Sequence, residues 1–199
     1  RARAAGGRGL APAPPGSGKT RAAFLWAIDR LATGAWERGR TSVLYVSPLR
    51  ALNNDVRKNL LAPLAGIAEY FSMAGGVFPE VQVLTRSGDT PQSERRAMLR
   101  RPPEILITTP ESLNILLLND GGRRVLSTVK TVILDEIHAL AGSKRGTHCI
   151  TAVERMVPLC GEFRRVALSA TVRPLEEVAA FAGGYELVAA AEGAEYRPR

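Results

Sequence analysis

Five short apolar runs, most of them ending in small polar residues or proline, constrain the fold of this 199-residue chain most strongly. The runs are nearly continuous, which is typical of strands buried on both faces of a parallel sheet. Amphipathic segments lie between them, and such alternation predicts βαβ units with right-handed crossovers. We therefore predict one α/β domain, a mainly parallel β-sheet flanked by helices. Its expected strands are 43–47, 81–85, 105–108, 132–135 and 166–169, and its expected helices are 19–33, 50–61, 92–100, 111–118, 147–157 and 176–182.

The start of the chain departs from this pattern. Residues 8–12 precede the first expected helix but contain little apolar material. We therefore expect either a very short first strand or a start that is not native-like.

Composition excludes several classes of protein. Hydrophobic residues make up 45% of the chain and charged residues 23%, which is near the globular average and argues against wholesale disorder. The longest apolar runs fall far short of the ~20 residues that a membrane span needs. Cys149 and Cys160 lack the spacing of a zinc site or a disulfide scaffold, so we expect a reducing, cytoplasmic setting. The net charge, 27 − 19 = +8, favours a polyanionic partner such as nucleic acid.

A glycine-containing loop ending in Gly-Lys-Thr opens the first expected helix. In such a loop, backbone N–H groups turn inward to hold phosphate oxygens, and the helix dipole adds positive charge. Lys19 would reach the β- and γ-phosphates, and the Thr20 hydroxyl would ligate Mg²⁺. The alternative is a helix start with a flexible glycine turn. The candidate nucleotide-binding residues are Gly16, Ser17, Gly18, Lys19 and Thr20.

An acidic pair follows the fourth expected strand. Asp135 would hold Mg²⁺, and Glu136 would orient or deprotonate an attacking water. His138 lies two residues beyond Glu136, where it would act as a relay. The alternative is a simple helix cap followed by an acidic first turn. Together with the Gly-Lys-Thr loop, the pair favours a P-loop NTPase.

Taken together, these segments resemble the first RecA-like lobe of superfamily 2 helicases with a DExH box. Ala13 begins the phosphate loop, as in that family, and Asp135-Glu136-Ile137-His138 looks like its motif II. Further motifs of the family resemble Ser47–Leu52, Arg86–Thr90, Thr108–Leu113 and Ser169–Thr171. The amino-acid sequence around these motifs is most similar to the Lhr-like branch.

The resemblance implies roles for further residues. Ser169 and Thr171 would couple the nucleotide site to movement of a second lobe. Small donors at helix starts contact phosphates without reading sequence. The resemblance implies that the chain contacts the backbone of one nucleic-acid strand, with DNA favoured. The implied contact residues are Pro48, Arg50, Ser87, Gly88, Asp89, Thr109, Pro110, Glu111 and Ser112. The proline-containing segments could instead be plain strand-to-helix transitions, and Ser169–Thr171 a turn or cap.

The resemblance also implies the organisation and the activity. We expect an irregular segment at 1–10, an ATP-binding helicase lobe at 11–190 and the start of a linker at 191–199. ATP and Mg²⁺ would be the cofactors of an ATP-dependent helicase or translocase with a role in DNA repair. Such helicases need a second RecA-like lobe, for which we find no motifs here, so we expect a fragment with weak or no turnover alone. The alternatives are a non-catalytic remnant that binds ATP or a single strand, and another P-loop phosphotransferase.

Overall fold

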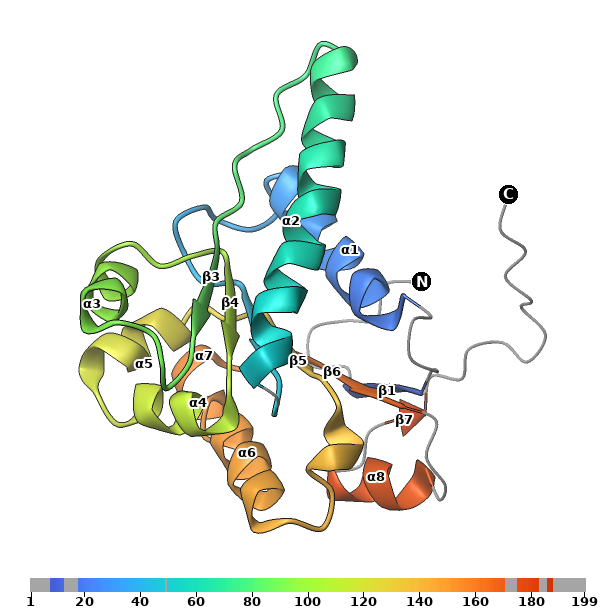
Figure 1. The fold of residues 1–199 in the computed structure, drawn as a ribbon, viewed down its shortest axis with the longest axis vertical. Coiled ribbons are helices and arrows are strands. Elements are labelled where there is room, and N and C mark those ends of the chain that lie inside the picture. Colours follow the sequence, from blue (N-terminus) through green and yellow to red (C-terminus); the bar gives the residue numbers. More distant parts are fainter. Residues whose placement is uncertain (1–7, 13–17, 49, 171–174, 183–185, 188–199) are drawn as a thin grey trace, which may run out of the picture.

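A parallel β-sheet forms the centre of the computed structural model, which describes residues 8–12, 18–48, 50–170, 175–182 and 186–187 (Figure 1). In this part of the chain the sheet has seven strands in the order β3-β4-β2-β5-β6-β1-β7, and every neighbouring pair is parallel. The strands are β1 (Arg8–Pro12), β2 (Val43–Val46), β3 (Val83–Arg86), β4 (Ile105–Thr108), β5 (Thr131–Leu134), β6 (Arg164–Ser169) and β7 (Glu186–Leu187). The predicted parallel α/β sheet is therefore confirmed.

The first strand is better formed than its sequence suggests. Strand β1 spans Arg8–Pro12 and pairs with β6 along its whole length. Only Leu10 is fully buried, and its neighbours Gly9 and Ala11 are small. One apolar side chain suffices here because β1 lies beside the end of the sheet, next to the two-residue strand β7. Residues 8–10, which we expected to be irregular, belong to this strand.

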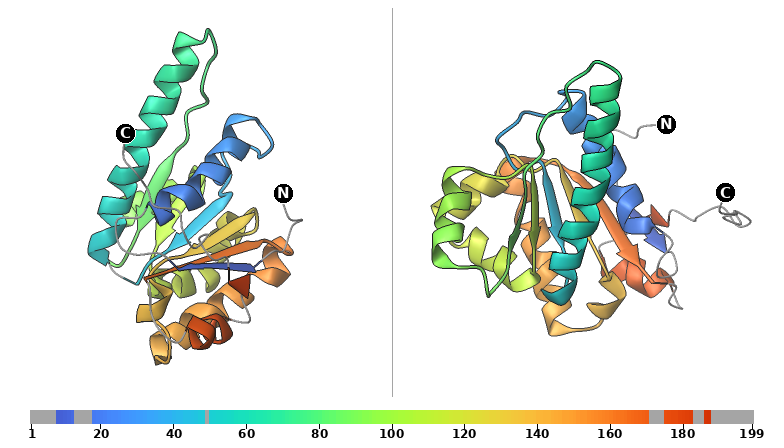
Figure 2. Two further views of the ribbon diagram at one scale, coloured as in Figure 1. Left: turned by 90° about the vertical axis from the view of Figure 1, so that its right-hand side faces the viewer. Right: turned by 45° about the horizontal axis from the view of Figure 1, so that its top comes forward.

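Helices cover both faces of the sheet (Figures 1 and 2). Helices α1 (Lys19–Ala32) and α2 (Arg50–Met73) share a core with Val43, Tyr45 and Ile105. The opposite core joins Leu44, Val46 and other strand residues to the remaining helices of the described chain. These are α3 (Gln92–Arg100), α4 (Pro110–Leu117), α5 (Asp120–Leu126), the 3₁₀ helix η1 (Ile137–Ala139), α6 (Lys144–Glu154), α7 (Val157–Cys160) and α8 (Leu175–Phe181). Within the described ranges, no helix combines the length and apolarity needed to cross a bilayer.

Helix α2 is twice as long as predicted. We expected it to end at residue 61, before Pro63, but it continues to Met73 and projects beyond the sheet (Figure 2). Leu60 and Leu64 are both buried against the α1 side of the sheet, and Ile67 packs against the same core. Packing on either side of the proline therefore maintains the helix despite the lost hydrogen bond.

The parallel arrangement determines where the candidate residues lie. The carboxyl ends of all strands meet at one edge of the sheet, where ligands bind in open α/β folds. Strands β2, β4 and β3 are neighbours, so the segments that follow them are adjacent as well. Strands β5 and β6 are also neighbours, which brings the acidic pair close to Ser169.

Candidate active site at the carboxyl edge of the sheet

The phosphate-loop sequence leads directly into helix α1. Gly18 is the N-cap of the helix and has φ of +81°, a left-handed conformation that favours glycine. Lys19 is the first helical residue, as predicted, and Thr20 follows it. No acidic residue stands in the first turn, so no carboxylate there offsets the positive end of the helix dipole. Gly16 and Ser17 lie outside the described residues.

A tyrosine joins this helix to the acidic pair. Asp135 follows β5 and is only 4% exposed, and its Oδ2 accepts a hydrogen bond from the hydroxyl of Tyr45 on β2. The Thr20 hydroxyl also hydrogen-bonds the Tyr45 side chain. Burial and the charge of Asp135 raise the pKa of Tyr45 far above its usual value, so the phenol stays protonated. Thr20 and Asp135, the two predicted Mg²⁺ ligands, are thus connected through one hydroxyl.

The oxygen atoms gathered here suit Mg²⁺. This ion binds one or two carboxylates together with phosphate and water oxygens, and it rarely occupies a cage made only of protein side chains. In the described ranges, no cluster of three or more His, Cys, Asp or Glu side chains could hold a metal. One carboxylate, Asp135, and one hydroxyl, Thr20, therefore fit an ion that is shared with a nucleotide.

Glu136 has an unusual backbone conformation. Its φ is +49° and its ψ is +40°, and it is the only non-glycine residue with positive φ in the part of the chain that the structure describes. Such a conformation costs about 1–2 kcal/mol, and a hydrogen bond of 2.9 Å from the Glu136 N–H to Asp135 Oδ1 supports it. The Glu136 carboxylate lies 3.2 Å from His138 Nε2. The two adjacent carboxylates therefore have separate partners, Tyr45 and His138.

His138 connects the acidic pair to the end of β6. The backbone N–H of Ala170 donates to His138 Nδ1 over 3.2 Å, and Ser169 Oγ lies 3.3 Å from the same nitrogen. A peptide N–H can only donate, so Nδ1 accepts from Ala170, and Nε2 on the other side of the ring faces the Glu136 carboxylate. The predicted coupling residue Ser169 is thus in contact with His138, whereas Thr171 lies outside the described residues.

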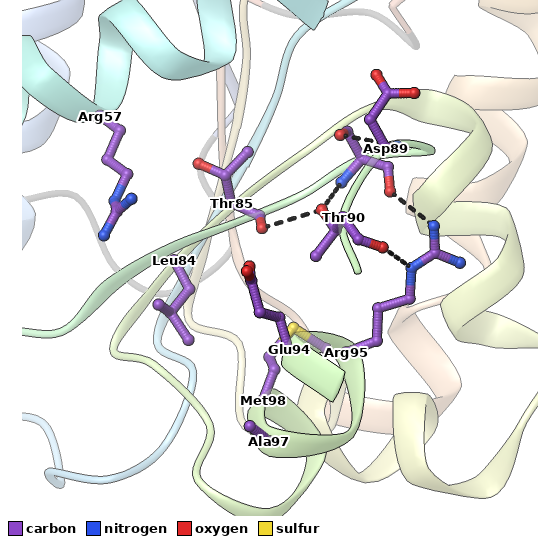
Figure 3. Close-up of a pocket in the computed structure, with 10 residues that line it drawn as sticks. Arg57, Leu84, Thr85, Asp89, Thr90, Glu94, Arg95, Ala97 and Met98 are labelled. Atoms are coloured by element: carbon purple, nitrogen blue, oxygen red, sulfur yellow. Dashed lines mark hydrogen bonds between the residues drawn. The ribbon is translucent and has the colours of Figure 1, made fainter. Parts of the chain in front are cut away.

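The loop after β3 is held by an arginine of the next helix (Figure 3). Arg95 donates to the backbone oxygens of Ser87 at 3.3 Å, Gly88 at 2.6 Å and Thr90 at 2.7 Å. Thr90 Oγ1 accepts from the Ser87 N–H, and Ser87 Oγ accepts from the Asp89 N–H. The predicted contact residues Ser87, Gly88 and Asp89 therefore form a compact turn. A cavity of about 520 Å³ lies beside it, lined by Arg57, Leu84, Thr85, Ser87, Asp89, Thr90, Glu94, Arg95, Ala97 and Met98.

The segment after β4 is mostly buried. Thr109 is the N-cap of α4, its Oγ1 accepts from the Ser112 N–H, and Pro110 begins the helix. Thr109 and Ser112 are 1% and 3% exposed, and the Thr109 hydroxyl lies 3.3 Å from Ser112 Oγ, so both hydroxyls have partners within the cap. Glu111 is exposed and forms a two-hydrogen-bond ion pair with Arg145 on α6. The hydrogen bond from Arg145 lowers the pKa of Glu111 to about 2.

The segment after β2 completes this edge. Pro48 is buried two residues after the end of the strand, and Arg50 begins α2. The ends of β2, β4 and β3 are adjacent, so Pro48, the α4 cap and the Ser87–Thr90 turn lie along one edge. The structure thus brings the three predicted contact segments together.

Sequence reasoning missed three residues of this edge. Tyr45 lies within a continuous apolar run and is indistinguishable there from a core residue. Arg95 is one of several arginines in a polar helix, and its loop contacts depend on the tertiary fold. Ala170 acts through its backbone N–H, which no side-chain pattern reveals.

Comparison with known proteins agrees with this geometry. The family model for the DEAD/DEAH box helicase matches residues 4–178. The chain is 54% identical over 181 residues to "Lhr helicase/ probable uracil glycosylase" of Mycolicibacterium smegmatis, which covers 90% of this chain and 12% of that protein. It is 51% identical over 179 residues to "ATP-dependent helicase Lhr-Core protein 2" of Thermococcus barophilus, which covers 88% of this chain and 21% of that protein.

A solved structure has the same fold. It is the Mycobacterium smegmatis helicase Lhr bound to ssDNA and AMP-PNP, with a TM-score of 0.85 and 50% identity. The match covers 92% of this chain and 23% of that one. The RecA-like fold is therefore confirmed. The chain spans about an eighth to a fifth of the length of the curated relatives it matches.

Proposed function

The chain belongs to the DEAD/DEAH box helicase family and is similar to its Lhr members, and we propose that it is the ATP-binding lobe of an ATP-dependent nucleic-acid helicase or translocase. The observation that carries this proposal is the continuous series of polar contacts Thr20–Tyr45–Asp135–Glu136–His138–Ala170. It joins the start of α1 to the ends of β2, β5 and β6, which are the elements that would surround a bound triphosphate.

Each predicted side chain has a task in this proposal. Lys19 would bind the phosphates, and Thr20 and Asp135 would hold Mg²⁺, which when bound neutralises phosphate charge. Glu136 would orient the attacking water and accept its proton. His138 would orient the Glu136 carboxylate through Nε2, and it contacts the end of β6 through Nδ1. A movement of Glu136 would therefore be transmitted through His138 to Ser169 and Thr171.

The nucleic acid would bind across the adjacent segments after β2, β4 and β3. The Ser87–Thr90 turn places small polar side chains at this edge, which suit a phosphate backbone and do not read bases, while the N–H groups of Ser87, Asp89 and Thr90 hold the turn together. A net charge of +8 favours such a partner. We propose a single strand, with DNA favoured because the similar solved helicase is bound to ssDNA.

Two broader features belong to the same proposal. A second RecA-like lobe would supply the arginine finger, which contributes ~10³–10⁵ in rate in related phosphoryl transfer, so this lobe alone would turn over slowly. Both cysteines are free, Cys149 being buried, which suits the cytoplasmic setting that we propose.

Binding of a fluorescent ATP analogue with and without Mg²⁺ tests the proposal. We expect saturable, Mg²⁺-dependent binding by the wild-type chain and its loss in Lys19→Ala. Arg21→Ala is the matched control, because Arg21 lies in the same first turn and is exposed. No binding by a folded wild-type chain, or equal binding by Lys19→Ala, would refute the proposal.

A further inference from the structure

The Tyr45 hydroxyl is a buried polar group in an otherwise apolar strand. All four residues of β2 are buried, and Tyr45 itself is 0% exposed. Its ring stacks on Phe24 of α1 with a centroid separation of 5.4 Å, and it belongs to the core between α1, α2 and the sheet. Phenylalanine would fill the same space, so packing alone does not account for the hydroxyl.

A hydroxyl that loses water on burial needs hydrogen-bond partners to offset the cost. The two partners of Tyr45 come from separate elements, Asp135 after β5 and Thr20 in the first turn of α1. These are the two side chains that would hold Mg²⁺. The remaining oxygen of Asp135, Oδ1, accepts from the Glu136 N–H, so both carboxylate oxygens are oriented by hydrogen bonds.

We propose that Tyr45 is a positioning residue for the Mg²⁺–nucleotide site. Its hydroxyl donates to Asp135 Oδ2 and bonds the Thr20 hydroxyl, and this holds the two oxygen ligands at a fixed separation before the nucleotide arrives. The inference rests on the proposed nucleotide-binding function. A carboxylate oxygen accepts more than one hydrogen bond or ligand contact, so the Tyr45 contact is compatible with metal binding at Asp135.

Tyr45→Phe tests this role because it keeps the stacked ring and removes only the hydroxyl. Loss of an orienting partner of a metal ligand reduces metal affinity about 10–100-fold. We therefore expect the Mg²⁺ concentration for half-maximal binding of the ATP analogue to rise about 10-fold or more. Binding of the analogue in EDTA should change much less, because the Lys19 contact does not involve Tyr45. Circular dichroism and thermal melting establish that each variant is folded.

Phe24→Leu is the matched control. It disturbs the same aromatic stack but leaves the hydroxyl and its partners in place. We expect Phe24→Leu to lower the melting temperature without altering the Mg²⁺ dependence. If Tyr45 had only a structural role, Tyr45→Phe would likewise lower the melting temperature and leave the Mg²⁺ dependence unchanged.

The possible outcomes separate the two proposals. An unchanged Mg²⁺ dependence in Tyr45→Phe, with normal binding by the wild type, overturns the positioning role and leaves the proposed function intact. An equal shift in Phe24→Leu also overturns it, because the hydroxyl would then not be the cause. Absence of Mg²⁺-dependent binding in the wild type overturns both.

Discussion

Replacement of Arg95 by alanine tests how the Ser87–Thr90 turn is held. The change removes three hydrogen bonds from one guanidinium, to the backbone oxygens of Ser87, Gly88 and Thr90. Hydrogen bonds from charged groups contribute about 1.5–3 kcal/mol when they are shielded from water. Here the Gly88 oxygen is exposed and the other two are partly buried, so we take less than 1 kcal/mol for each, about 2 kcal/mol in total.

That loss should appear as local opening of the turn. A change of about 2 kcal/mol corresponds to about 30-fold in the opening equilibrium. Hydrogen–deuterium exchange measures it at the amides of Ser87, Asp89 and Thr90, each of which donates within the turn. We expect about 30-fold faster exchange there in Arg95→Ala, with unchanged protection in the buried strands β2 and β5.

Two further variants identify the cause. Arg96→Ala removes the neighbouring exposed arginine, whose side chain has no hydrogen bond or ion pair within the described residues, and it should leave the exchange unchanged. Arg95→Lys keeps the charge but loses the planar fork, so it should restore only a fraction of the protection. Unchanged exchange in Arg95→Ala, or full protection in Arg95→Lys, would refute the reasoning.

Two stability predictions concern other contacts. Arg145 lowers the pKa of Glu111 from 4.5 to about 2, so the ion pair should stabilise the fold above pH 4.5 and lose this effect as the pH falls towards 2. Both side chains are more than a third exposed, so urea unfolding at pH 7 should show less than about 1 kcal/mol between wild type and Glu111→Gln, with no difference near pH 2. A Cβ at Gly146 would lie 2.0 Å from the Leu140 backbone oxygen, so Gly146→Ala should cost about 3 kcal/mol in thermal unfolding. At Gly66, in α2, nothing lies within 4 Å, so Gly66→Ala should instead stabilise by about 0.5–1 kcal/mol. Equal effects at the two glycines would contradict the packing argument.

The sheet could be predicted because its central strands are buried on both faces and therefore read as apolar runs. The five predicted strands occur within about two residues of their expected positions. Strand β1 gave a weaker signal because its burial depends on Leu10 alone. Helix α2 was predicted too short: it continues through Pro63, a residue that usually ends a helix, because packing of Leu60 and Leu64 outweighs that preference.

The candidate site could be predicted only where the side chain itself carries the signal. The positions of Lys19, Asp135 and Glu136 followed from motifs at element boundaries. The contact between His138 and Ala170 joins residues 32 positions apart, and the hydrogen bond of Tyr45 to Asp135 spans 90 positions. Such pairings depend on strand order, which sequence patterns do not specify.

The central claim is tested most directly by measuring ATP hydrolysis. The protein to use is this lobe joined to a second RecA-like lobe, assayed with and without single-stranded DNA. We predict hydrolysis that rises when the strand is added and is lost in Glu136→Gln, while binding of the ATP analogue persists in that variant. A protein that binds ATP but hydrolyses it at one rate with and without any nucleic acid would contradict the account.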